Sequence, residues 1–63
     1  MSEYEKELLN KIVIMFKELQ HTKSKEELGK AINNIIIGSI FKHRSEEFIG
    51  NLFIIKRNIY LGR

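Results

Sequence analysis

The chain has 63 residues, so it forms one domain at most, and a chain of this length has little material for a core. It contains no cysteine, which excludes disulfides and thiolate metal sites, and folds of this size usually need some such staple. The formal net charge is +3, a mild bias that falls short of the clustered basic surface of a dedicated nucleic-acid binder. Association with a second copy is the remaining way to stabilise so small a fold.

The N-terminal segment predicts a helix over about 3–20. Ser2 occupies the N-cap position, and Glu5, three residues later, completes a capping box. An apolar stripe with steps of four, three and four residues follows, made of Leu8, Ile12, Met15 and Leu19. This spacing places all four side chains on one face of the helix.

A polar turn over about 21–24 precedes a second helix. Ser24 and Glu27 form another capping box, so this helix is expected to start at Lys25. The segment Ile35-Ile36-Ile37 covers about 200° of the helix circumference, because successive residues are about 100° apart. One facing helix cannot cover so wide an arc, and the segment is therefore expected to be buried from several sides.

The polar segment 42–47 leaves two architectures open. Ser45 can cap a third helix, which gives a three-helix monomer with helices near 3–20, 25–42 and 46–60. Alternatively, Phe41 lies seven residues before Phe48 and keeps the same helical phase, which favours one continuous helix over about 25–60, with an interruption near 43–45 left open.

The prediction for the whole chain, 1–63, is a single all-α domain: a helical hairpin that dimerises into an antiparallel four-helix bundle. The dimer is preferred over the three-helix bundle monomer because Ile37, Phe53 and Ile54, among others, remain uncovered once the main stripes face each other. The predicted dimer core consists of Leu8, Ile12, Met15, Leu19, Leu28, Ile32, Ile36, Ile40, Phe48, Leu52, Ile55 and Ile59.

In its length, its Ile/Lys/Glu-rich composition without cysteine or proline, and its two helical halves, the chain resembles the small helical protein of the spindle-shaped viruses of Sulfolobus. The resemblance covers the full length and carries no signature motif, so it transfers no functional residue. It implies a Rop-like helical hairpin dimer inside an infected cell, a role as an adaptor, and no catalysis.

The sequence offers little for chemistry. His43, Glu46 and Glu47 are the nearest approach to a metal site, and a solvated charged segment is the preferred interpretation of them. Ser2, Ser24 and Ser45 all have capping roles, which leaves no serine placed beside a base as a nucleophile. We therefore expect no enzyme activity, no metal and no cofactor.

The preferred function is a homodimeric adaptor that binds an unknown protein through two identical outer faces. The candidate docking surface comprises exposed residues near the ends of elements: Lys42, Arg44, Glu46, Glu47, Lys56, Arg57 and Tyr60. The alternative is a small regulator that binds nucleic acid through its phosphate backbone, using the basic members of that set. A membrane role is not expected, and the acidic start of the chain predicts a cytoplasmic location, which is the host cytoplasm if the protein is viral.

Overall fold

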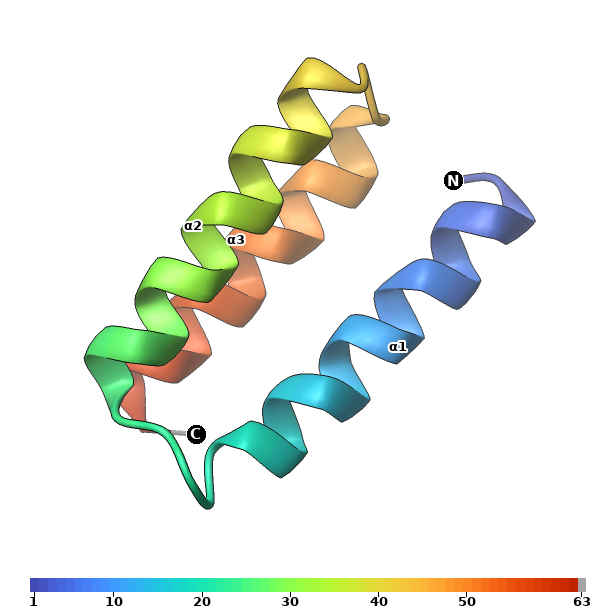
Figure 1. Cartoon of the computed structure of the whole chain (residues 1–63). Helices are drawn as coiled ribbons and strands as arrows, with labels where there is room; N and C mark the ends of the chain where they lie inside the picture. The colour runs from blue at the N-terminus through green and yellow to red at the C-terminus, as the bar shows by residue number, and fades with distance from the viewer. Residues whose placement is uncertain (63) are drawn as a thin grey trace.

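The structure is a computed structural model that describes residues 1–62. Three α-helices, and no strand, are present over this range: α1 (Glu3–Leu19), α2 (Lys25–Phe41) and α3 (Glu46–Leu61) (Figure 1). The all-α prediction is confirmed, and the three-helix alternative matches the observed elements. The helix predicted over about 25–60 is not continuous: it is divided between Phe41 and Glu46, where the sequence left an interruption open.

The segment between α2 and α3 breaks the helix by its backbone conformation. His43 has a left-handed φ of 55°, which reverses the chain, and the Oγ of Ser45 accepts a hydrogen bond of 3.1 Å from the N–H of Phe48. Phe41 therefore ends α2 and is 78% exposed instead of continuing the core stripe towards Phe48. The shared phase of these two phenylalanines does not reflect one helix.

The predicted caps are present in whole or in part. Ser24 and Glu27 form the full capping box, with both hydrogen bonds at 3.2 Å. At α1, the Oγ of Ser2 accepts from the N–H of Glu5 at 3.1 Å, but the Glu5 carboxylate does not return to Ser2. Only half of that predicted capping box exists, because this side chain binds another helix.

In the view of Figure 1 the three helices run down, up and down. α2 and α3 lie side by side and antiparallel, and α1 runs alongside them in the same direction as α3 (Figure 1). The core forms where the three helices meet, and its buried hydrophobic side chains are Ile12, Phe16, Leu28, Ile32, Ile36, Phe48 and Leu52. Ile32, Phe48 and Leu52 have no exposed surface at all.

Most of the residues predicted for a dimer core already pack within one chain. Six of them are buried, namely Ile12, Leu28, Ile32, Ile36, Phe48 and Leu52. Leu8, Leu19, Ile55 and Ile59 are partly buried and pack against these. Met15 and Ile40 are exposed, at 39% and 53%. The single chain therefore has a core of its own, and the dimer stays a prediction.

The chain nevertheless exposes more surface than its mass requires. Its accessible surface is 4722 Å², whereas a compact monomer of 7.5 kDa exposes about 4,200 Å². The Cα trace measures 30 × 18 × 16 Å, so the molecule is elongated along its helices.

Candidate functional site

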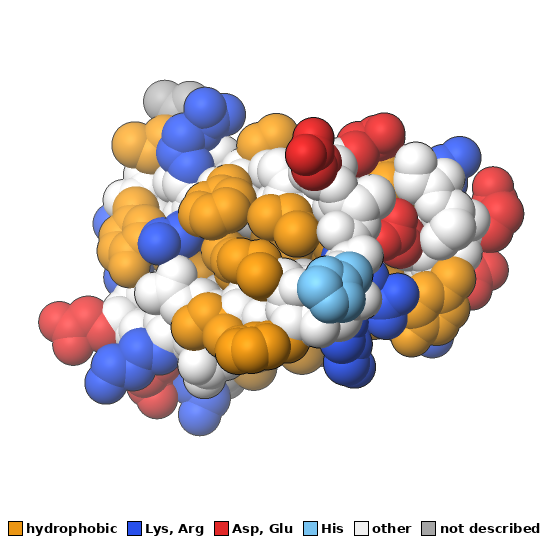
Figure 2. Space-filling view, turned by 90° about the horizontal axis from the view of Figure 1, so that it is seen from above, with side chains coloured by type: hydrophobic (Ala, Val, Ile, Leu, Met, Phe, Trp, Pro, Cys, Tyr) orange, Lys and Arg blue, Asp and Glu red, His pale blue; other side chains and the backbone are white. Residues whose placement is uncertain are grey.

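A group of hydrophobic side chains lies on the α2–α3 pair, on the face turned away from α1. We call it the α2–α3 patch and define it by Ile37 and Ile40 of α2 with Phe53 and Tyr60 of α3. Each of these side chains is between 50% and 54% exposed. Figure 2 shows hydrophobic side chains gathered in the middle of one face, with charged side chains towards its edges. A patch of this kind on a small protein is typical of an interaction surface.

Helical geometry explains why these four residues share one face. The ring of Tyr60 lies so close to Gly29 that a Cβ added there would come within 2.7 Å of the phenol oxygen. Gly29 therefore marks the side of α2 that faces Tyr60, and Ile40 follows it by eleven residues, or about three helical turns. Phe53 precedes Tyr60 by seven residues and thus lies on the same face of α3.

The other face of the same helix pair is the one that α1 covers. Ser39 of α2 lines a groove together with Leu8 of α1, and Ile55 of α3 lines a second groove together with Phe16 of α1. Ser39 and Ile55 lie on different faces of their helices from the patch residues. The α2–α3 pair thus has one covered and one uncovered face.

The α3 part of the uncovered face carries a regular stripe. Glu46, Gly50, Phe53 and Arg57 follow one another at steps of four, three and four residues. The stripe begins with an acid, ends with a base, and has a glycine and an aromatic ring between them. Gly50 is exposed, and no atom of the neighbouring elements lies within 4 Å of where its Cβ would be. No packing contact within the chain therefore requires glycine at this position.

The predicted docking residues fall into two groups along α3. One group comprises Lys42 and Arg44 between α2 and α3 with Glu46 and Glu47 in the first turn of α3, and the other comprises Lys56, Arg57 and Tyr60 in the second half of α3. Two members are engaged inside the chain. The guanidinium of Arg44 lies 4.9 Å from the ring centroid of Tyr4, and the carboxylate of Glu47 lies 3.5 Å from the ammonium of Met1. The set is therefore not one continuous surface.

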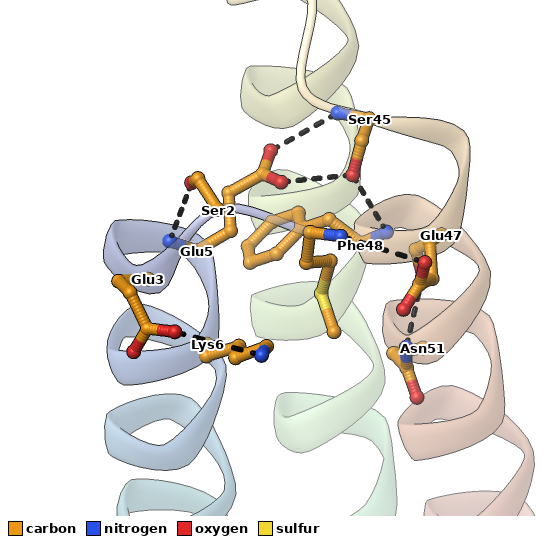
Figure 3. Close-up of polar contacts among 9 residues, drawn as sticks. Ser2, Glu3, Glu5, Lys6, Ser45, Glu47, Phe48 and Asn51 are labelled. Atoms are coloured by element: carbon orange, nitrogen blue, oxygen red, sulfur yellow. Dashed lines mark hydrogen bonds and ion pairs between the residues drawn. The ribbon is translucent and has the colours of Figure 1, made fainter.

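A contact between the starts of α1 and α3 lies at the end of the molecule that holds the α2–α3 turn (Figure 3). The carboxylate of Glu5 accepts a hydrogen bond from the N–H of Ser45 at 3.0 Å and another from its hydroxyl at 2.9 Å. The Ser45 oxygen in turn accepts from the N–H of Phe48. One buried carboxylate thus links two helices 40 residues apart in sequence.

The electrostatics of this contact favour the ionised acid. The N–H and hydroxyl of Ser45, which donate to the carboxylate, hold the pKa of Glu5 below its ordinary value, and the charge of Arg44 acts in the same direction. The positive ends of two helix dipoles also meet there. The Ser24 N–H likewise lowers the pKa of Glu27 in the α2 capping box.

The described residues contain no arrangement suited to metal binding. Over 1–62, no three His or acidic side chains converge in a way that can hold an ion, and His43 does not combine with Glu46 and Glu47 into such a group. Ser2, Ser24 and Ser45 each accept a hydrogen bond from a helix N-terminus, as their sequence positions predict. In the same range, every helix is too short or too polar to cross a bilayer.

Comparison of the chain with protein-family models, with curated proteins and with solved structures finds no match. The fold and the surface are therefore the basis for any functional inference.

Sequence reasoning missed two features of these surfaces. It assigned Glu5 only to the local capping box, since a partner 40 residues away leaves no signal in the spacing. It also did not predict that Gly50 is exposed beside Phe53. The spacing of Gly50 and Phe53 could have indicated this contact surface. A glycine and a phenylalanine three residues apart on an exposed helix face are unusual for a surface that contacts only solvent.

Proposed function

We propose that this protein is a non-enzymatic interaction module that forms a homodimer through the uncovered face of α2 and α3, and that the dimer acts as an adaptor. The observation that carries the proposal is the stripe Glu46-Gly50-Phe53-Arg57 beside the α2–α3 patch. A second copy related by a two-fold axis would cover the patch on both chains at once.

The size of the uncovered face supports this partner. Stable interfaces bury roughly 600–1,000 Å² on each partner. The long face of a molecule whose Cα trace measures 30 × 18 Å offers an area of this order once its side chains are included. The interface would be composed of the α2–α3 pairs of two chains, which together form a four-helix arrangement.

The order of residues along the stripe favours antiparallel contact between the two α3 helices. A two-fold axis between Gly50 and Phe53 would place each Phe53 ring against the Gly50 of the partner copy, where no side chain is in the way. The same axis would bring Glu46 of each copy next to Arg57 of the other, because both lie about equally far from its centre. The stripe is therefore complementary to itself in shape and in charge.

The adaptor role follows from what such a dimer leaves free. Both copies of α1 would face outwards on opposite sides, and the turn residue Lys42 would stay accessible on each chain. Two identical outer surfaces would then be available to a protein partner. Of the candidate docking residues, Glu46, Arg57 and Tyr60 would become part of the dimer contact.

Nucleic acid is the less favoured partner. The basic residues proposed for phosphate contact are divided between the α2–α3 turn and the second half of α3, and Arg44 already lies on the ring of Tyr4. Phosphate-backbone binding generally uses a continuous basic surface.

Disulfide cross-linking tests the dimer and its register together, because the chain has no cysteine of its own. In the proposed dimer, position 46 of one copy faces position 57 of the other. An equimolar mixture of the Glu46→Cys and Arg57→Cys variants should therefore form a disulfide-linked dimer under mild oxidation. Each variant alone should not, since its two cysteines would be about 16 Å apart along the helix and a disulfide needs Cα atoms within about 7 Å.

Sedimentation of the unmodified protein provides the accompanying measurement, with a dimer expected at micromolar concentration. A monomer at those concentrations would refute the dimer. A dimer whose single-cysteine variants cross-link with themselves, but not with each other, would keep the dimer and refute the antiparallel register. Ile14→Cys, at an exposed position on α1, is the matched control and should not cross-link beyond the background of random collisions.

A further inference from the structure

A groove lies at the end of the molecule opposite the Glu5–Ser45 contact. It is formed by the last turns of α1, the α1–α2 turn, the start of α2 and the end of α3, and its volume is about 470 Å³. This volume is within the range of about 300–1,000 Å³ found for small-molecule sites. None of the four residues of the α2–α3 patch lines it, so it is separate from the proposed dimer face.

One part of the groove wall is apolar and partly rigid, and the polar side chains of Gln20, His21 and Asn58 line the rest together with the lysines. Phe16 and Leu28 line it and also belong to the buried core, and Val13, Ile55 and Ile59 add half-buried aliphatic surface. Side chains fixed by core packing keep their positions when a ligand arrives. The groove therefore offers preformed apolar surface, which lowers the ordering cost of binding.

The rim of the groove carries positive charge from three different segments. Lys17 comes from α1, Lys23 from the turn and Lys25 from α2, and no acidic residue is among the residues that line the groove. Lys23 makes a loose ion pair of 4.0 Å with Glu27. Lys17 and Lys25 form no ion pair with a carboxylate of residues 1–62, and the Nζ of Lys25 lies beside Gly62 at the end of α3.

We propose that this groove binds a single-chain carboxylate amphiphile, that is, a fatty acid. The alkyl chain would lie on Val13, Phe16 and Ile59, and the carboxylate would accept charge-assisted hydrogen bonds from the rim lysines. An apolar wall without a single acid, combined with three ammonium groups at its edge, matches a ligand that is apolar along its length and anionic at one end.

The dimensions favour one short chain over a phospholipid. The α3 side of the groove extends from Ile55 to Gly62, which is about 10 Å of helix. A wall of this length matches a medium acyl chain, and the volume leaves no room for two long ones. This ligand requires neither the dimer nor the adaptor role, so the inference does not depend on them.

Sodium decanoate is the probe for the test, added below its micellar concentration to the full-length protein and followed by two-dimensional amide NMR. Decanoate should shift the resonances of Val13, Leu28 and Ile59 in a saturable manner. Binding should tighten about three- to fourfold for each methylene added from hexanoate to decanoate, as expected for burial of the chain. Decyltrimethylammonium, with the same chain and the opposite charge, should bind at least tenfold more weakly.

Two pairs of variants locate the site. The double change Lys17→Gln with Lys25→Gln should weaken decanoate binding about tenfold, whereas Lys11→Gln, an exposed lysine of α1 outside the groove, should leave it unchanged. Val13→Trp should fill the groove and abolish binding. Ile14→Trp is its control, because Ile14 is the next residue on α1, is 57% exposed and does not line the groove.

The proposal is overturned if the cationic and anionic probes bind equally well. It is also overturned if decanoate shifts the resonances of Ile37 and Phe53 in place of those of the groove, since the ligand would then occupy the α2–α3 patch. Amide spectra of each variant without ligand show whether it is folded. If Val13→Trp fails to fold, the lysine pair with its Lys11 control still decides the outcome.

Discussion

The α2–α3 pair has two long apolar faces, and the chain covers only one of them. On the covered face, Phe48 and Leu52 pack under α1 and lose all contact with solvent. On the uncovered face, Phe53 and Ile37 keep half of their surface exposed. Hydrophobic content alone does not distinguish the two faces, since both carry large aliphatic and aromatic side chains at helical spacing.

The difference between the faces is informative because neighbouring residues, about 100° apart on the same helix, differ in burial. Ile36 is buried and Ile37 is exposed, and likewise Leu52 is buried and Phe53 is exposed. Such pairs share their helix and their local propensity, so substitutions at them separate the stability of one chain from the association of two.

The largest effect is expected from a charge in the core, at Ile36. Ile36→Glu should abolish folding, because it buries a carboxylate among apolar side chains at a cost comparable to the whole stability of so small a domain. Ile37→Glu should keep the helical circular dichroism of the parent and lose the dimer in sedimentation. A folded Ile36→Glu protein would show that Ile36 does not belong to the core.

Truncating one buried and one exposed side chain of α3 should change the free energy of unfolding by smaller amounts, which can be compared directly. Leu52→Ala should lower the free energy of unfolding by about 2–5 kcal/mol, since it leaves a cavity at a fully buried position. Phe53→Ala should lower the unfolding free energy of the monomer by less than about 1 kcal/mol and should raise the dimer dissociation constant. Chemical denaturation at two protein concentrations separates these contributions. Equal losses for the two variants in dilute protein would contradict the distinction between the faces.

Acid should weaken the attachment of α1 to the covered face. The pKa of Glu5 is lower in the folded chain than in the unfolded one, so its contribution is complete above about pH 4.3 and is lost as the pH falls through the folded value. The melting temperature should therefore drop in this window. Glu5→Gln should remove part of that dependence and lower the melting temperature at neutral pH by several degrees.

Glu27→Gln is the control for this effect. The pKa of Glu27 is also lowered, but its hydrogen bonds stay within the cap of α2 and hold no second helix. Glu27→Gln should reduce the stability without loosening α1, which the amide resonances of Leu8 and Ile12 report. If the two variants affect α1 equally, the Glu5–Ser45 contact does not attach it.

The smallest effect is expected at Gly50, where one substitution should stabilise the monomer but weaken the dimer. In a monomer, Gly50→Ala should raise the free energy of unfolding by up to about 1 kcal/mol, because alanine is the better helix former and the new Cβ meets nothing. In the proposed dimer, the same methyl group should push against Phe53 of the second copy and weaken association. Gly38→Ala is the control, since its site is equally open and lines the groove shared with α1. An unchanged dissociation constant for Gly50→Ala would remove glycine from the contact.

Much of this fold was predictable from local signals. The start of each helix follows from a serine N-cap at Ser2, Ser24 or Ser45, and the apolar stripes identify most of the core. The choice between two and three helices was not predictable in this way. The polar segment after Phe41 is compatible with an exposed helix, and only the left-handed backbone of His43 makes it a turn.

The surfaces were less accessible to sequence reasoning. Exposure depends on where α1 lies, and α1 is held by core packing and by the contact between Glu5 and Ser45, which no local rule connects. Met15 and Ile40, which the stripes predict for a dimer core, are exposed in the single chain. The fatty-acid groove likewise combines residues from three helices and a turn, and its charge pattern exists only once they assemble.

The attachment of α1 across 40 residues has a consequence for folding kinetics. The α2–α3 hairpin closes over a short turn and so pays little loop entropy, whereas Glu5 must find Ser45 across most of the chain. We therefore expect the hairpin to form first and α1 to dock last. In native-state hydrogen exchange, the amides of α1 should open as one unit before those of α2 and α3, and each opening would briefly leave the hairpin with both of its faces bare.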